Sequence, residues 1–165
     1  MKLDKDFIWG VSSSAYQIEG AEREDGRGAS VWDSEFSSGH VLGDMNGKIA
    51  CDHYHRYKED VALLKKAGIK NYRFSVSWPR IIPNGTGEIN EKGVEFYKNL
   101  VDELIAADIT PWVTIYHWEL PRKLYEKGGY LNEEFSDWFA DFAAKVVDIF
   151  GDKVTNYIIF NEPQC

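Results

Sequence analysis

The chain has 165 residues, of which 44% are hydrophobic and 15% aromatic, and it carries a formal net charge of -8 at pH 7. This length and apolar content are sufficient for one domain with a sizeable core. The acidic excess is scattered along the chain, which argues against binding to nucleic acid because nothing would neutralise a phosphate backbone. We therefore expect a small neutral or polar ligand.

Cysteine usage and the N-terminal residues indicate a cytoplasmic protein. The only cysteines are Cys51 and Cys165, so no disulfide framework is implied and a reducing compartment is favoured. The first residues run into an apolar segment without the core of a signal peptide, and no run approaches membrane-spanning length. We expect no membrane partner.

The N-terminal third begins with a strand and continues into a long irregular segment. The apolar run at residues 7–11, closed by three serines, predicts the first strand. Residues 19–50 are rich in Gly, Ser and Asp and too long for an ordinary connection, so we interpret them as the rim or lid of a site, with Trp32 as a packing residue. Asp52 is placed to cap a helix that ends at Gly68.

The next strand and helix are predicted from two different spacings of apolar residues. Residues 72–78 alternate between large apolar and polar side chains, which places Arg73 on the face opposite the large apolar groups. From Asn90 a helix follows with an apolar stripe. The stripe consists of Val94, Tyr97, Val101, Leu104 and Ile105.

The last two strands end in polar residues. Residues 110–118 form the third strand, which ends on His117 and Trp118. A helix from Asn132 to residue 150 follows, and residues 154–160 form the fourth strand. That strand delivers Asn161 and Glu162 to its carboxyl end, because Pro163 has no amide hydrogen and terminates the ladder.

Strands that alternate with helices indicate right-handed crossovers and a parallel sheet, either doubly wound or a barrel. The polar ends of the strands and the long loop fall at one end of the sheet, as at the mouth of a strand-helix barrel, so we favour the barrel. A closed barrel has eight strands and about 250 residues. The α/β chain thus accounts for roughly the first four strands and three helices, and we predict that residues 1–165 form the N-terminal half of a single (β/α)8 barrel.

Five motifs follow one another along the chain. They are FIWGVSSSAYQIEGA at 7–21, DHYHRYKED at 52–60, YRFSVSWPR at 72–80, YHWELP at 116–121 and NEP at 161–163. Together they resemble the N-terminal portion of the family 1 glycoside hydrolases, the β-glucosidase family, over essentially the whole chain. The resemblance implies a (β/α)8 barrel and retaining hydrolysis of β-linked glucosides, galactosides or their 6-phosphates.

The resemblance assigns the general acid/base to Glu162. Retaining hydrolysis needs two carboxyl groups roughly 5–5.5 Å apart, and burial beside the second carboxylate keeps the acid protonated. In the family the nucleophilic glutamate lies in a Thr-Glu-Asn-Gly stretch on the seventh strand, and Arg73 resembles the arginine beside it. This sequence contains no such stretch, so we expect the isolated chain to be inactive, with Arg73 left without that partner.

The resemblance also implies a polar sugar pocket. Asn161 would bind the sugar 2-hydroxyl, Gln17 and His117 would bind other ring hydroxyls, and Trp118 would form part of the wall. Amides and imidazole supply the donors and acceptors that sugar hydroxyls require. We expect no metal or organic cofactor, because the His53-x-His55 pair has no third ligand at suitable spacing and is better explained as the surface of a helix start.

Several alternatives stay open. Glu119 stands where the family usually has Asp, and Gln164 where Trp is common, which leaves the leaving-group specificity undetermined. The chain is also compatible with a non-catalytic sugar-binding protein, or with a half-barrel that only assembles. In either case the open edges of the first and fourth strands predict pairing with a complementary C-terminal half or with a second copy.

Overall fold

The protein is described from a computed structural model, in which residues 3–33, 43 and 45–164 are placed. Four strands form one parallel sheet in the order β1-β2-β3-β4. They are β1 (Val11–Ser12), β2 (Asn71–Ser75), β3 (Thr110–Tyr116) and β4 (Asn156–Phe160). In the register, Arg73 lies opposite Trp112 and Thr114 opposite Ile158, so the predicted parallel α/β sheet is confirmed.

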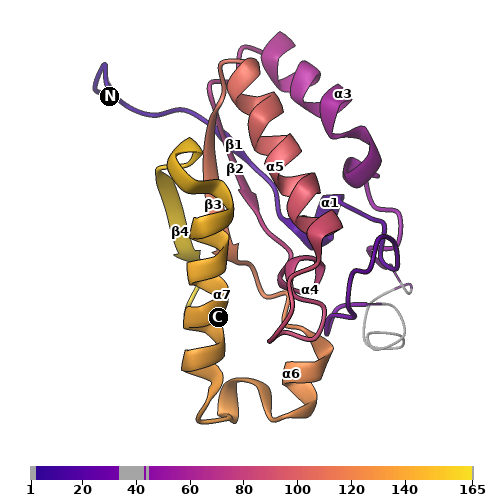
Figure 1. The fold of residues 1–165 in the computed structure, drawn as a ribbon. Helices are drawn as coiled ribbons and strands as arrows, with labels where there is room; N and C mark the ends of the chain where they lie inside the picture. Colours follow the sequence, from indigo (N-terminus) through magenta and orange to yellow (C-terminus); the bar gives the residue numbers. More distant parts are fainter. Residues whose placement is uncertain (1–2, 34–42, 44, 165) are drawn as a thin grey trace.

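Three long helices connect successive strands: α3 (His53–Lys66), α5 (Glu91–Ala106) and α7 (Phe135–Phe150). Figure 1 shows them packed along the same face of the sheet. Shorter elements lie between them: α1 (Ala15–Ile18), α4 (Trp78–Ile81), α6 (Arg122–Glu126), and the 3-10 helices η2 (Gly129–Leu131) and η3 (Gly151–Lys153). In the part of the chain that the structure describes, no helix has the length and apolarity to cross a membrane.

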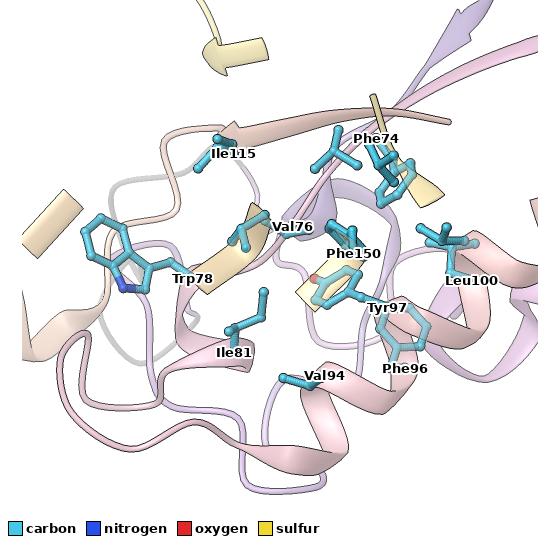
Figure 2. Packing of buried hydrophobic residues seen from close by; sticks show 14 of the residues in the cluster. Phe74, Val76, Trp78, Ile81, Val94, Phe96, Tyr97, Leu100, Ile115 and Phe150 are labelled. Atoms are coloured by element: carbon cyan, nitrogen blue, oxygen red, sulfur yellow. The ribbon is translucent and has the colours of Figure 1, made fainter. Parts of the chain in front are cut away.

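The core lies between these helices and the sheet. Figure 2 shows Phe74, Val76 and Ile115 from the sheet side and Tyr97 and Leu100 of α5, which belong to one buried cluster. Trp78 stacks on Phe142 of α7 with ring centroids 4.5 Å apart and an interplanar angle of 2°. Such aromatic pairs contribute about 0.5–1.5 kcal/mol beyond the burial of their area.

The first strand is shorter than predicted. Only Val11 and Ser12 pair with β2, whereas Phe7, Ile8 and Trp9 are 48%, 57% and 68% exposed. The physical reason is that β1 is an outer strand and finds ladder partners on one side only. Gly10 marks where the chain approaches β2, because a Cβ there would lie 2.7 Å from the carbonyl oxygen of Asn71.

The second strand also ends earlier than the alternation suggests. β2 stops at Ser75, and Trp78 opens α4 instead of closing the strand. Pro79 explains this, since proline fits the first turn of a helix, where its missing amide hydrogen costs nothing. β3 likewise ends at Tyr116, so His117 and Trp118 lie just beyond it.

The long helices are where the periodicity predicts them, with corrections at their ends. Asp52 occupies the cap position of α3, but its carboxylate bonds the ring of His55 instead of capping the helix. α7 begins at Phe135 rather than Asn132, whose side-chain oxygen accepts a hydrogen bond from the amide of Glu134. In α5 the predicted stripe is buried except for Ile105, which is exposed.

Candidate active site

Polar side chains gather where β2, β3 and β4 end. His117 and Trp118 follow β3, and Asn161 and Glu162 follow β4. Because the strands are parallel, their carboxyl ends meet at one edge of the sheet. The hydrogen bond from the amide of Asn161 to the carbonyl of Tyr116, 2.9 Å long, ties the two ends together.

Arg73 projects from β2 on the face opposite Tyr72 and Phe74, as predicted. Its Nη2 donates to Oδ1 of Asn161 and its Nε donates to Oγ1 of Thr114, both at 2.7 Å. These partners are an amide and a hydroxyl, so they orient the guanidinium without neutralising its charge. The cation is therefore held at the end of β4, beside the residue that precedes Glu162.

His117 is half-buried and lies in the field of two opposite charges. Burial is the largest cause that lowers the pKa of His117, Arg73 lowers it further, and Glu162 opposes both. Its Nδ1 is buried without a hydrogen-bond partner among the described residues. With Nδ1 buried, the neutral imidazole has Nε2 as its ring nitrogen for a polar ligand, either as donor or as acceptor.

Trp118 lies in a turn with an unusual backbone. Its φ of 64° is in the left-handed region, which is rare for a bulky residue. The indole Nε1 donates to the carbonyl of Asn161 at 2.9 Å. Trp118, Asn161 and Glu162 line a pocket of about 400 Å³ that Tyr130 and Phe160 close from the side.

Glu162 lines this pocket but is exposed, so the expected burial of the acid is not found in the described residues. Its φ of 46° turns the chain sharply after β4. The carboxylate nevertheless remains close enough to His117 to affect its titration. Glu162, Asn161 and His117 therefore form one group, and Glu162 is not isolated from it.

Gln17 lies on α1, which packs against the end of β2 through a hydrogen bond from the amide of Ala15 to Oγ of Ser75. Its side-chain oxygen accepts a hydrogen bond from Ser14 at 2.7 Å. Among the described residues, no hydrogen bond joins Gln17 to the other predicted site residues. The structure thus places Gln17 at the correct end of the sheet with a local partner only.

The two histidines at the start of α3 have different environments. His53 is buried against Phe96 and its ring bonds Asp60 at 2.6 Å, so the prediction that it belongs to a surface is wrong. His55 is exposed and bonds Asp52 and Glu24. Within the described ranges no group of three or more His, Cys, Asp or Glu side chains is arranged to hold a metal ion.

A buried charge cluster next to the site was not predicted. Arg27 bonds Asp33 and Glu119, and Trp32, which we expected to be a packing residue, is exposed and donates its indole hydrogen to the carbonyl of Trp118. The signal in the sequence is weak, because Arg27 and Glu119 are 92 residues apart. Residues 34–42 and 44 of the rim or lid candidate lie outside the described residues.

A parallel sheet covered by helices, with polar side chains at the carboxyl ends of its strands, is typical of strand-helix barrel enzymes. Comparisons with known proteins identify the family. The family model of glycosyl hydrolase family 1 matches residues 1–165. β-Glucosidase A of Thermotoga maritima is 49% identical over 163 residues, and β-glucosidase A of Acetivibrio thermocellus is 49% identical over 160 residues. The chain belongs to glycosyl hydrolase family 1.

The structural comparison agrees and shows how much of the fold is present. A family 1 β-glucosidase from Thermotoga maritima superimposes with a TM-score of 0.95, covering 98% of this chain and 38% of that one. In sequence the match covers 98% and 96% of this chain and 36% of each of the two β-glucosidases A. The chain therefore has the fold of part of a (β/α)8 barrel and spans little more than a third of the length of its relatives.

Proposed function

We propose that this chain supplies the acid/base side of a retaining β-glycosidase site of the β-glucosidase type, with Glu162 as general acid/base. The observation that carries the proposal is the grouping at the strand ends, where Arg73 bonds Asn161 at 2.7 Å and Glu162 acts electrostatically on His117. Retaining hydrolysis needs this kind of carboxyl group opposite a second one. Family membership supports the same reaction.

The hydrogen bonds suggest how each side chain meets a sugar. Oδ1 of Asn161 is engaged by Arg73 and Oε1 of Gln17 by Ser14, so both amides present their NH2 groups as donors. His117 offers Nε2, because its Nδ1 is buried. The indole hydrogen of Trp118 is already bonded, so its ring serves as an apolar wall.

The nucleophile comes from outside these residues. Glu119, a carboxylate close to the site in sequence, is buried and bonded to Arg27 and Ser77, so it does not face Glu162. We place the second carboxylate in the remainder of a longer barrel, which would also cover the exposed Glu162. The isolated chain is accordingly inactive in this proposal, and residues 1–165 are the N-terminal half of one barrel domain.

The same proposal names the partner. β1 and β4 are the outer strands, and the face of the sheet opposite the helices has a pocket of about 420 Å³ lined by Ile8, Val11, Arg73, Trp112 and Ile158, among others. Apolar surface beside unpaired strand edges favours strand addition. A complementary C-terminal half is the preferred partner for these edges, and a second copy is the alternative.

The cytoplasm is the proposed location, on composition and cysteine count alone.

A fusion of this chain to the remaining C-terminal part of the Thermotoga maritima β-glucosidase tests the activity. The fusion should hydrolyse an aryl β-glucoside, and Glu162→Gln should lower kcat by about 10²–10⁴-fold because proton donation to the leaving group is lost. The loss should be smaller for a leaving group that needs little protonation. Glu88→Gln, at an exposed carboxylate, is the control and should leave kcat unchanged.

The isolated chain gives the complementary result. We expect no turnover of the aryl glucoside, and turnover that Glu162→Gln abolishes would overturn the assignment of the nucleophile to a missing part. A fusion that binds glucose without any hydrolysis would support the non-catalytic alternative. A fusion whose kcat is unaffected by Glu162→Gln would refute the role of Glu162.

A further inference from the structure

The turn after β3 needs support from its surroundings. Trp118 has a left-handed φ of 64°, and a bulky residue holds such a conformation only where neighbouring contacts impose it. The turn carries His117 and Trp118, which both belong to the candidate site. The contacts that impose its conformation therefore matter for the geometry of the pocket.

Glu119, the next residue, provides buried and charge-assisted contacts beside the turn. It is 3% exposed, and its Oε1 accepts hydrogen bonds from Nη2 of Arg27 at 2.7 Å and from Oγ of Ser77 at 2.8 Å. The guanidinium of Arg27 also forms a bidentate pair with Asp33 at 2.9 and 3.0 Å. Charge-assisted bonds of this kind define direction as well as energy.

The contacts extend around the whole turn. The indole Nε1 of Trp32 donates to the carbonyl of Trp118 at 2.7 Å, and the amide of Val31 donates to the carbonyl of Leu120 at 3.0 Å. Residues 27–33, from the loop after β1, thus lie along residues 118–122, from the loop after β3. The Arg27–Glu119 pair joins these two loops at their buried side.

We propose that Glu119 is a positioning residue that holds, through Arg27, the turn carrying His117 and Trp118 in its binding geometry. The inference rests on the proposed function only in that the turn serves a sugar pocket. The support of the turn by Glu119 and Arg27 does not depend on that function. Buried ion pairs are weak evidence for stability, but they are able to specify a single arrangement.

A neighbouring cluster offers a matched control. Glu19 is 4% exposed and bonds Nε of Arg80 at 2.9 Å and the hydroxyl of Tyr97 at 2.6 Å. It resembles Glu119 in burial and in having an arginine and a hydroxyl as partners. It differs in location, because it follows α1 and its bonded partners lie on α4 and α5. It acts on Glu119 electrostatically, but among the described residues it forms no hydrogen bond to the turn.

The test measures hydrogen exchange of three indole groups by NMR, each assigned by replacing that Trp with Phe. Trp118 and Trp32 report on the turn, and Trp78, whose Nε1 donates to the carbonyl of Gly85, reports on global opening. Glu119→Gln should speed exchange at Trp118 and Trp32 about tenfold relative to Trp78. Glu19→Gln should leave that ratio unchanged.

Other outcomes overturn the proposal. If Glu119→Gln accelerates all three indoles equally, Glu119 is merely structural, and if it accelerates none, the turn does not depend on it. Should Glu119→Gln fail to fold, Ser77→Ala removes one bond to Glu119 and retains all charges. It should then accelerate Trp118 relative to Trp78 by a smaller factor, and an unchanged ratio contradicts the inference.

A titration with deoxynojirimycin separates this inference from the proposed function. If the wild-type chain binds this sugar analogue, Glu119→Gln should weaken binding about tenfold and Glu19→Gln should not. Equal weakening by both variants counts against positioning. If neither the wild-type chain nor its fusion to the C-terminal part of the Thermotoga maritima β-glucosidase binds the analogue, the sugar-binding role proposed for this chain fails, and the indole exchange ratios still decide the role of Glu119.

Discussion

At the scale of single residues, His117 is held neutral by its neighbours. Burial and the Arg73 cation lower the pKa of His117 from its ordinary 6.5, and Glu162 acts in the opposite direction. Since the folded state favours the neutral ring, this contribution to stability is present above pH 6.5 and is lost as the pH falls below it. At neutral pH the ring is both a donor and an acceptor.

The pKa of His117 should respond to both charged neighbours with opposite signs. Glu162→Gln should lower the pKa of His117 further, and Arg73→Met should raise it, because each removes one electrostatic influence. The Cε1–H resonance in an NMR pH titration measures both changes. His55, whose pKa is raised by Asp52, should not move in either variant, and a wild-type midpoint above 6.5 for His117 would contradict the assignment.

Glu119 is the second residue whose titration the fold alters. Burial raises the pKa of Glu119 from 4.5 to about 6, against the opposing effect of Arg27, and Glu19 raises it further. Two buried ion pairs lie beside it: Arg27 also pairs with Asp33, and Arg80 pairs with Glu19. Burial lowers the pKa of Arg27, but Glu119 and Asp33 outweigh it and raise that pKa, so Arg27 stays charged and the cost of burial falls on the carboxylate.

The sign of the pH effect follows from this shift. Between pH 4.5 and about 6 the folded state binds more protons at Glu119 than the unfolded state, so stability falls as the pH rises. We expect the free energy of unfolding of the wild type minus that of Glu119→Gln to fall by about 2 kcal/mol from pH 4 to pH 7. Urea unfolding at several pH values measures it, and a difference that rises with pH would refute the shift.

At the scale of elements, α5 is packed closely against α4. Gly93 is buried in the first turn of α5, and a Cβ there would lie 2.1 Å from the carbonyl oxygen of Arg80. This oxygen belongs to the backbone of α4, so it cannot move aside as the end of a flexible side chain can. The contact between the two helices therefore requires glycine, although helix propensity alone favours alanine by up to about 1 kcal/mol.

Gly93→Ala should destabilise the protein by about 1–3 kcal/mol in spite of its better helix propensity. The midpoint of thermal or urea unfolding measures the change. Asn99→Ala, at an exposed position of the same helix, is the control and should be neutral or stabilising by a few tenths of a kcal/mol. If Gly93→Ala is as stable as the wild type or more stable, the contact between α4 and α5 does not require glycine at this position.

At the scale of the whole molecule, the sheet has two outer strands and apolar surface beside them. Ile159 on β4 is 52% exposed, and Ile8 and Trp9 are exposed next to β1. A closed barrel removes such edges, whereas an open four-stranded sheet retains them. The isolated chain is therefore expected to associate.

Light scattering should show association that increases with concentration, and Ile159→Lys should shift the equilibrium toward monomer because a charge on an edge strand opposes pairing. Leu131→Lys is the matched control, since Leu131 is exposed and apolar but lies in η2, away from the strand edges. A wild-type chain that is monomeric at all concentrations would contradict the prediction.

The order of elements and the gathering of the candidate site residues at one edge of the sheet could be predicted without coordinates. The spacing of apolar residues, every second residue in a strand and every third or fourth in a helix, locates the parallel strands and long helices. A strand or helix that packs one face on a core needs that spacing in its own residues. Residues that end parallel strands share one edge of the sheet, which is why His117, Trp118, Asn161 and Glu162 are found together.

The family, the strand-helix alternation and the polar edge can be read from the amino-acid order, since each is expressed in neighbouring residues. The contact between Arg27 and Glu119, the burial of His53 and the exposure of Glu162 are seen only in the folded chain. These features depend on contacts between distant segments, or on covering surface, which no local period encodes. Burial and long-range pairing are properties of the assembled chain.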